Sequence, residues 1–254
     1  MLPELHEREA TLRQFFALAP NVPLRREDAP IPDVSSTVAA HLARFNLEWH
    51  IIPAADAVPL DEKYFTRLYP TRPRTFTQSD YHGESLQTTL TRSHRRHQGL
   101  LLAIESTRKP RYRQNNRQFY GTLYGHDATA DPFASYLGQA GFTNSTRYAH
   151  TYVPVREFVT LVTNDWRARG LLPRGYRLTV CSPTILNLIG MVFHPEWSES
   201  ESLELGFYRD EKGNGHCFTV GSNMPGDFSY LQHIETSADW TYLGFRLMLV
   251  PETI

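Results

Sequence analysis

The chain has 254 residues, of which 41% are hydrophobic and 21% are charged, and its formal net charge is −1 at pH 7. This composition is typical of a globular protein with a sizeable core, in one large domain or two small ones. The near-neutral charge predicts no general attraction to polyanions, and no apolar run is long enough to span a bilayer.

The first twenty residues mix acidic and basic side chains with apolar ones, whereas a secretory signal places an apolar segment after a charged one. The two cysteines, Cys181 and Cys217, are too few for a disulfide framework. We therefore expect a cytoplasmic protein with no membrane partner.

In the first part of the chain, apolar residues at helical spacing predict a helix over residues 4–18, followed by an extended, proline-rich connector. Asp33, Ser35 or Ser36 is a suitable N-cap for a helix over residues 36–46, which runs into a short strand at 47–52. A short helix is expected within residues 60–70, and residues 71–85 have the composition of a loop.

Residues 86–98 fit either a helix or a strand, and residues 99–107 form the clearest buried strand of the first half. After loop-like residues 108–132 and a short helix within 132–142, the strongest helix pattern covers 153–173, between Pro154 and Gly170. We then expect a short helix after Pro183, strands at 203–210 and 216–222, a long loop at 223–240 and a final strand at 241–250.

The final strand carries a glycine, Gly244, and a charged residue, Arg246, among apolar neighbours. Glycine in a strand allows close approach of a neighbouring backbone or ring. A buried guanidinium needs a carboxylate or carbonyl partner, for which Glu196 is the candidate. The other interpretation is an edge strand from which Arg246 points into solvent.

The order of motifs over residues 130–254 resembles the formylglycine-generating-enzyme type of C-type-lectin-like fold. A helix precedes a Gly-Tyr-Arg-Leu turn, then come a Glu-Trp-Ser turn, a Gly-Ser strand end and a terminal Gly-Phe-Arg strand. Two motifs depart from the family pattern, since "RLTVCSPT" lacks the expected proline and "GSN" lacks a tryptophan. The matching residues are Gly175, Tyr176, Arg177, Leu178, Thr184, Glu196, Trp197, Ser198, Gly221, Ser222, Gly244, Phe245 and Arg246.

The resemblance implies an α+β protein with a C-type-lectin-like mixed sheet, flanking helices and an extra N-terminal helical layer. Residues 1–90 would form the helical or extended N-terminal segment, and residues 91–254 the lectin-like domain, with both parts able to form one compact unit. The last strand would run through the middle of a sheet, and Trp197 would meet Arg246. The copper-binding cysteine pair of formylglycine-generating enzymes has no counterpart, and "SHRRHQG" lacks the acid of the sulfoxide-synthase iron motif.

Under this resemblance the protein is a ligand- or protein-binding module, because the rigid frame presents contacts on irregular loops. We expect exposed aromatic and polar loop residues to form the site, with an arginine-rich patch that binds anions. The expected partner is a protein or a small anionic ligand. The loop residues are Trp197, Asn223, Asp227, Phe228, Tyr230, Trp240 and Tyr242, and the arginines are Arg95, Arg96, Arg111, Arg113 and Arg117.

A first alternative is a metal-dependent enzyme of the two-histidine-one-carboxylate type. His82 and Glu84 are two apart and would share a strand face, whereas His94 and His97 are three apart and would share a helix face. A divalent metal is the cofactor of this alternative, and no other cofactor is indicated. Hydrogen-bonded or solvated histidines explain the same spacings more simply, and His194 repeats the His-x-Glu pattern with no obvious partner.

A second alternative is nucleic-acid or nucleotide binding through the Arg-rich segment 91–117. The segment holds eight Lys or Arg residues and one acid, Glu105, with aromatic residues in and beside it, a combination that suits phosphate contact and base stacking. The other interpretation is a solvated face balanced by the acidic residues between 196 and 211. Mg²⁺-nuclease chemistry is disfavoured because its acid and lysine should be two residues apart on a strand, whereas Glu105 and Lys109 are four apart.

Overall fold

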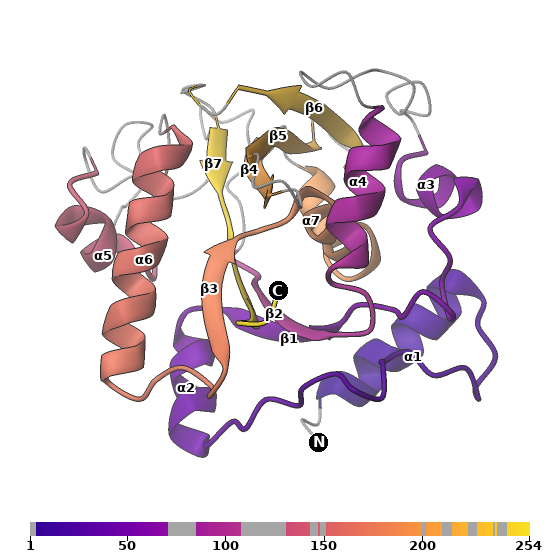
Figure 1. Ribbon diagram of the computed structural model, residues 1–254, viewed down its shortest axis with the longest axis horizontal. Helices are drawn as coiled ribbons and strands as arrows, with labels where there is room; N and C mark the ends of the chain where they lie inside the picture. Colours follow the sequence, from indigo (N-terminus) through magenta and orange to yellow (C-terminus); the bar gives the residue numbers. More distant parts are fainter. Residues whose placement is uncertain are drawn as a thin grey trace.

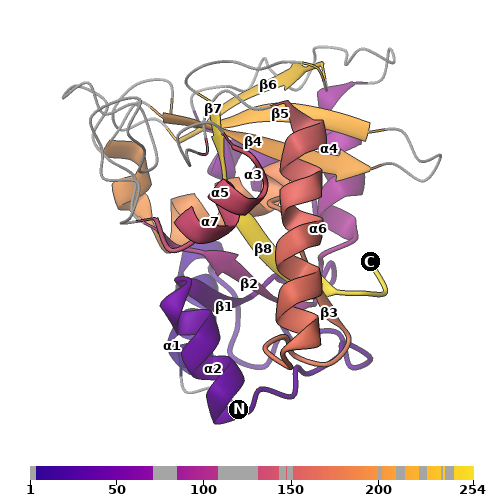
Figure 2. The same cartoon turned by 90° about the vertical axis from the view of Figure 1, so that its left-hand side faces the viewer.

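The computed structural model describes residues 4–70, 85–107, 131–142, 147, 151–199, 202–209, 215–222, 228–235, 237 and 243–254. In these residues, helices pack around two four-stranded sheets, so the protein belongs to the α+β class. Figures 1 and 2 show one sheet above the other, with helices at their sides. Among the described residues, no helix is both long and apolar enough to cross a lipid bilayer.

The first sheet contains the C-terminal strand in an internal position. Its order is β1 (Leu47–Ile51), β2 (Leu101–Glu105), β8 (Leu247–Pro251) and β3 (Tyr176–Val180), with antiparallel neighbours throughout. The expectation that the end of the chain pairs with strands from far earlier is therefore confirmed for β8. Because β1 pairs with β2, the N-terminal segment contributes a strand to the same sheet as the C-terminus.

The second sheet has the order β6 (Tyr230–Ile234), β5 (Gly215–Ser222), β4 (Ser202–Arg209) and β7 (Leu243–Phe245). Strands β4, β5 and β6 form an antiparallel meander, and β7 pairs with β4 in parallel. The expected loop at 223–240 thus contains strand β6, in which Leu231 and Ile234 are buried and Gln232 is exposed.

The expected single strand at 241–250 is in fact two strands, β7 and β8, which belong to different sheets. Arg246 lies between them, and its carbonyl oxygen accepts the Cys181 N–H at 2.9 Å. Gly244 is buried and lies opposite Glu204 in the register of β4 and β7, and Arg246 donates to the Glu204 carboxylate. The chain passes from one sheet to the other at this residue.

Arg246 has no exposed surface, so the interpretation in which it points into solvent is wrong. Its guanidinium carbon lies 3.9 Å from the centre of the Trp197 ring, which confirms the expected meeting of the two residues. Its carboxylate partner is Glu204 at 3.0 Å rather than the expected Glu196, which instead accepts a hydrogen bond from His194. Glu204 fills this role because β4 lies directly beside β7.

Three helices of the N-terminal half have side-chain caps. Ser35 caps α2 (Ser36–Arg44), Asp61 caps α3 (Glu62–Leu68), and Ser85 caps α4 (Leu86–Arg95). Helix α1 (Glu4–Phe16) packs on β1. Residues 86–95, which fitted a helix or a strand, are therefore helical, and their buried side chains lie at helical spacing.

The C-terminal half contains the short helix α5 (Ala134–Gln139) and two longer helices that pack on the sheets. Helix α6 (Tyr152–Ala168) buries one stripe of side chains and packs on β3, where the sequence predicted no strand. Helix α7 (Pro183–Val192) is buried for most of its length between α4 and the second sheet. A 3₁₀ turn, η6 (Pro195–Glu199), follows it and carries Trp197.

Buried charges connect the two sheets. Arg147 pairs with Glu105 at the end of β2 and with Asp131, at 2.7 Å and 2.6 Å. Arg246 pairs with Glu204 of β4 and also donates to the carbonyl oxygens of residues 105 and 107. Each of these buried charges has a partner of opposite sign, as burial in a protein interior requires.

Candidate functional site

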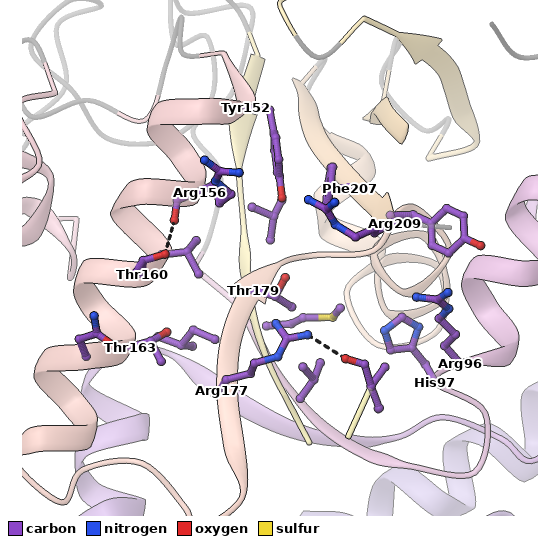
Figure 3. Close-up of a pocket in the computed structure, with 18 of the residues that line it drawn as sticks. Arg96, His97, Tyr152, Arg156, Thr160, Thr163, Arg177, Thr179, Phe207 and Arg209 are labelled. Carbon is purple, nitrogen blue, oxygen red and sulfur yellow. Dashed lines mark hydrogen bonds between the residues drawn. The ribbon is translucent and has the colours of Figure 1, made fainter. Parts of the chain in front are cut away.

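An arginine-lined cavity of about 460 Å³ lies between α6, β3, β4 and the end of α4. Figure 3 shows several of its side chains facing one another from these elements. The arginines come from four elements or their ends: Arg96 follows α4, two belong to α6, one to β3 and one to β4. They are Arg96, Arg156, Arg167, Arg177 and Arg209.

Local geometry explains why these arginines converge. Arg156 and Arg167 are eleven residues apart, which is close to three helical turns, so they lie on one face of α6. Arg177 and Thr179 alternate with buried residues on β3, which directs both toward the side that α6 covers. Strand β4 ends at Arg209, at the rim of the same cavity.

The cavity has a positive lining, because none of the described residues that line it is acidic. Arg167 pairs with Glu252 at 2.5 Å, but both side chains are about half exposed, so solvent screens the pair. Arg177 donates to the main-chain oxygen of Ile254 at 2.9 Å. Burial lowers the pKa of Arg177, although an arginine remains protonated at physiological pH.

Aromatic and hydroxyl groups complete the lining. The rings of Tyr152 and Phe207 stack with centroids 3.8 Å apart and 14° between their planes. Burial raises the pKa of Tyr152 to about 12, so its hydroxyl stays protonated and can donate. Thr163 is largely buried, and its hydroxyl has no hydrogen-bond partner among the described residues. The cavity therefore offers cationic groups, a planar aromatic wall and an available hydroxyl.

His97 contributes a neutral ring to the cavity. Its Nδ1 donates to the carbonyl oxygen of Ser93 at 2.9 Å, which leaves Nε2 as an acceptor. Burial, together with the nearby charges of Arg96 and Arg177, lowers the pKa of His97 to about 4, although the hydrogen bond to Ser93 opposes this shift. His97 and Arg96 are the residues of the sequence-predicted sets that lie at this cavity.

The other expected ligand-binding residues have different positions. Trp197 and Phe228 are 1% and 2% exposed, so a ligand does not reach them without rearrangement of the core, whereas Tyr230 is half-buried. Arg95 is exposed and does not line the cavity. The remaining expected residues lie outside the described part of the chain: Asn223, Asp227, Trp240, Tyr242, Arg111, Arg113 and Arg117.

The expected metal ligands are not brought together in the part that the structure describes. His94 is buried beside the hydroxyl of Tyr64, at 3.1 Å from its Nε2, and burial lowers its pKa to about 3. His97 bonds to the backbone of its own helix. His82 and Glu84 lie outside the described residues.

A different cluster has the composition of a metal site. One ligand atom from each of Glu48, His50 and His194 lies within 4.8 Å of the other two. The Arg8 guanidinium donates to Glu48 at 2.6 Å. Burial opposes ionisation of Glu48, but its interactions with His194 and Ser106 and the charge of Arg8 outweigh this effect and lower the pKa of the carboxyl to about 2.

Neither the cavity nor this cluster was anticipated as a unit from the sequence. The cavity arginines span residues 96–209, and only the packing of α6 and β4 around β3 brings them together. A partial signal was present for the cluster, since Glu48 and His50 are two apart on an expected strand and His194 precedes Glu196 by two residues.

Comparisons of this chain with protein-family models, with curated proteins and with solved structures find no match. The function is therefore inferred from the chemistry of the residues.

Proposed function

We propose that this protein is a ligand-binding module whose arginine-lined cavity binds a small organic anion, with phosphate or carboxylate groups beside a planar ring. The observation that supports the proposal is the convergence of five arginines on one cavity whose described lining contains no acid. Guanidinium groups form planar, bidentate hydrogen bonds to phosphate and carboxylate, which suits such a ligand.

The electrostatics favour an occupant of negative charge. Like charges around one cavity repel one another, and the repulsion is stronger where side chains are partly desolvated, as Arg177 is. Arg167 pairs with a carboxylate, but both side chains are about half exposed and solvent screens the pair. A bound anion relieves the repulsion and therefore stabilises the folded state, by an amount that grows with ligand concentration.

The size and walls of the cavity favour a small molecule over a polymer. A volume of about 460 Å³ falls within the range of small-molecule pockets. The stacked Tyr152 and Phe207 rings supply an aromatic surface, and the Thr163 hydroxyl supplies a donor that no described residue uses. A nucleotide has both of the features that these groups recognise, an anion and a planar base.

A C-type-lectin-like scaffold is part of the proposal. Two features support it: the internal position of the C-terminal strand, and the contact of Arg246 with Trp197 across the two sheets. In this proposal the frame presents the ligand in a cavity beside β3, whereas the sequence pattern suggested the loops after β5. The proposed protein is a binding module rather than an enzyme.

The experiment is calorimetric titration of the purified protein with pyrophosphate, citrate, AMP and ATP, with adenosine as the uncharged comparison. We expect the anions to bind and adenosine to bind at least about tenfold more weakly, which corresponds to about 1.4 kcal/mol. The double variant Arg156→Gln/Arg209→Gln removes two exposed cavity cations and should weaken anion binding by at least about tenfold.

The matched control is Arg95→Gln/Arg174→Gln, which removes two exposed arginines that do not line the cavity. If both double variants bind alike, or if no anion binds at millimolar concentration, the proposal is wrong. Binding of a single-stranded oligonucleotide with steep salt dependence, in the absence of binding to the small anions, would favour nucleic-acid recognition instead.

A further inference from the structure

We propose that Glu48, His50 and His194 form a binding site for a divalent first-row transition metal, and that the metal displaces the Arg8 guanidinium. This site is separate from the arginine-lined cavity, with which it shares no residue. Two imidazoles and a carboxylate are a common donor set for Zn²⁺ and related ions, which then keep further positions for water or a ligand.

Two elements position the three ligands. Glu48 and His50 alternate on β1 and therefore point to the same side of the strand. His194 follows directly after the C-cap of α7, where the chain turns into η6. The His50 ring packs against Phe193, with centroids 4.7 Å apart, which brings the end of α7 onto this side of β1.

The hydrogen bonds of His194 leave the correct nitrogen available. Its Nδ1 lies 2.9 Å from Glu196 Oε1, so Nδ1 carries the proton that it donates to this carboxylate. The lone pair of Nε2 then faces Glu48, whose Oε2 lies 3.5 Å away. Metal-bound histidines usually have such a carboxylate on the second nitrogen, and here the ring also stacks on Trp197 at 4.5 Å.

His50 also presents an acceptor nitrogen. Arg8 Nη1 lies 2.8 Å from His50 Nε2, and because arginine has no acceptor, Nε2 accepts this bond. The same guanidinium donates through Nη2 to Glu48 Oε2 at 2.6 Å. Two acceptor atoms of the cluster therefore already bind one cation, the Arg8 guanidinium. A metal ion would bind the same two atoms in its place.

The spacing requires only a small adjustment. With ligand bonds of about 2.1 Å, two ligands of a tetrahedral site lie about 3.4 Å apart. Glu48 Oε2 lies 3.5 Å from His194 Nε2 and 3.9 Å from His50 Nε2, so side-chain rotations bring the atoms into range. The Arg8 side chain is 17% exposed, so its guanidinium lies close to solvent, into which it moves when a metal replaces it.

The experiment uses the full chain, freed of metal with a chelator, and titrates it with Zn²⁺ and with Co²⁺ as the spectroscopic probe. We expect one equivalent to bind and Co²⁺ to give visible absorption bands. Glu48→Gln, which keeps the shape of the side chain, and His194→Ala should each weaken binding by at least about tenfold. Arg8→Met should strengthen it by at least about tenfold, because the competing cation is lost.

The control is His6→Ala, which removes an exposed histidine from the same helix as Arg8 and should leave the metal affinity unchanged. Equal affinity of the wild type, Glu48→Gln and His194→Ala would overturn the proposal, as would the absence of binding to both the wild type and Arg8→Met. Binding to Arg8→Met alone would show that the guanidinium is not displaced in the native protein and would also overturn it. Anion titrations of the same variants keep this result distinct from that for the cavity.

Discussion

Arg246 explains why a charged residue lies within an otherwise apolar C-terminal segment. Its guanidinium contacts the Trp197 ring on one side, while its nitrogen atoms donate to Glu204 and to carbonyl oxygens of residues 105 and 107. One side chain thus joins β4, the end of β2 and η6 at the point where the chain leaves one sheet for the other. The planar fork of arginine permits this set of bonds, which a lysine would not reproduce.

We predict that Arg246→Met lowers the free energy of unfolding by about 3–5 kcal/mol, because it leaves the Glu204 carboxylate buried without its cation. Urea denaturation monitored by tryptophan fluorescence measures the loss. The double variant Arg246→Met/Glu204→Gln should recover part of the stability, since it removes the unpaired charge. If the double variant loses the sum of the two single losses, the pair does not act as a unit.

Trp197 belongs to the core. Its ring packs against Arg246, His194 and Phe228, and it is 1% exposed. We predict that Trp197→Ala lowers the free energy of unfolding by about 3–5 kcal/mol through loss of buried contacts. Tyr230→Ala, at a half-buried position on β6, is the comparison and should cost much less. A melting temperature unchanged by Trp197→Ala would instead mark Trp197 as a surface residue.

At the scale of secondary-structure elements, the close packing of α7 depends on Gly190. A Cβ atom added there would lie 2.3 Å from Cε1 of Phe228, far closer than a carbon contact allows. The Asn187 side chain on the same helix donates to the Phe228 carbonyl at 2.8 Å, so the phenylalanine is held in place. Helix α7 and Phe228, two residues before β6, therefore fit together only because position 190 lacks a side chain.

Gly190→Ala should accordingly destabilise the protein by about 1–3 kcal/mol, although alanine has the higher helix propensity by about 1 kcal/mol. Chemical denaturation measures this loss of stability. Adding Phe228→Leu to Gly190→Ala should recover stability relative to the sum of the two single effects, because the smaller side chain removes the clash. An increase in stability for Gly190→Ala alone would show that Phe228 moves away at no cost.

The sequence predicted the elements whose patterns are local. Helices α6 and α7 follow from a buried stripe bounded by Pro154 and Gly170, and from an apolar run after Pro183. The break at Arg246 was not predictable, because it depends on Glu204, which lies 42 residues earlier in the chain. The cavity was missed for the same reason, since each of its arginines looks like an ordinary surface residue until the elements pack.

At the scale of the whole molecule, buried neutral histidines make stability depend on pH. Burial lowers the pKa of His97 to about 4 and that of His94 to about 3 in the folded protein, against an ordinary value of 6.5. Between these values and 6.5, the unfolded chain binds protons that the folded chain excludes. Stability is therefore highest above pH 6.5 and falls as the pH falls, by about 1.4 kcal/mol per pH unit for each ring.

We predict that the free energy of unfolding falls between about pH 7.5 and pH 5.5, and that His97→Gln makes this fall smaller, because one of the proton-linked groups is removed. Over the full range from 6.5 to about 4, the ring of His97 accounts for about 3 kcal/mol. Urea titrations at several pH values above 5 measure the free energy of unfolding. In more acidic solution the raised pKa of buried Asp131 gives the opposite slope. Parallel pH profiles for the wild type and His97→Gln would show that the folded protein accommodates a protonated ring at this position, which would place water or a counter-anion in the cavity beside it.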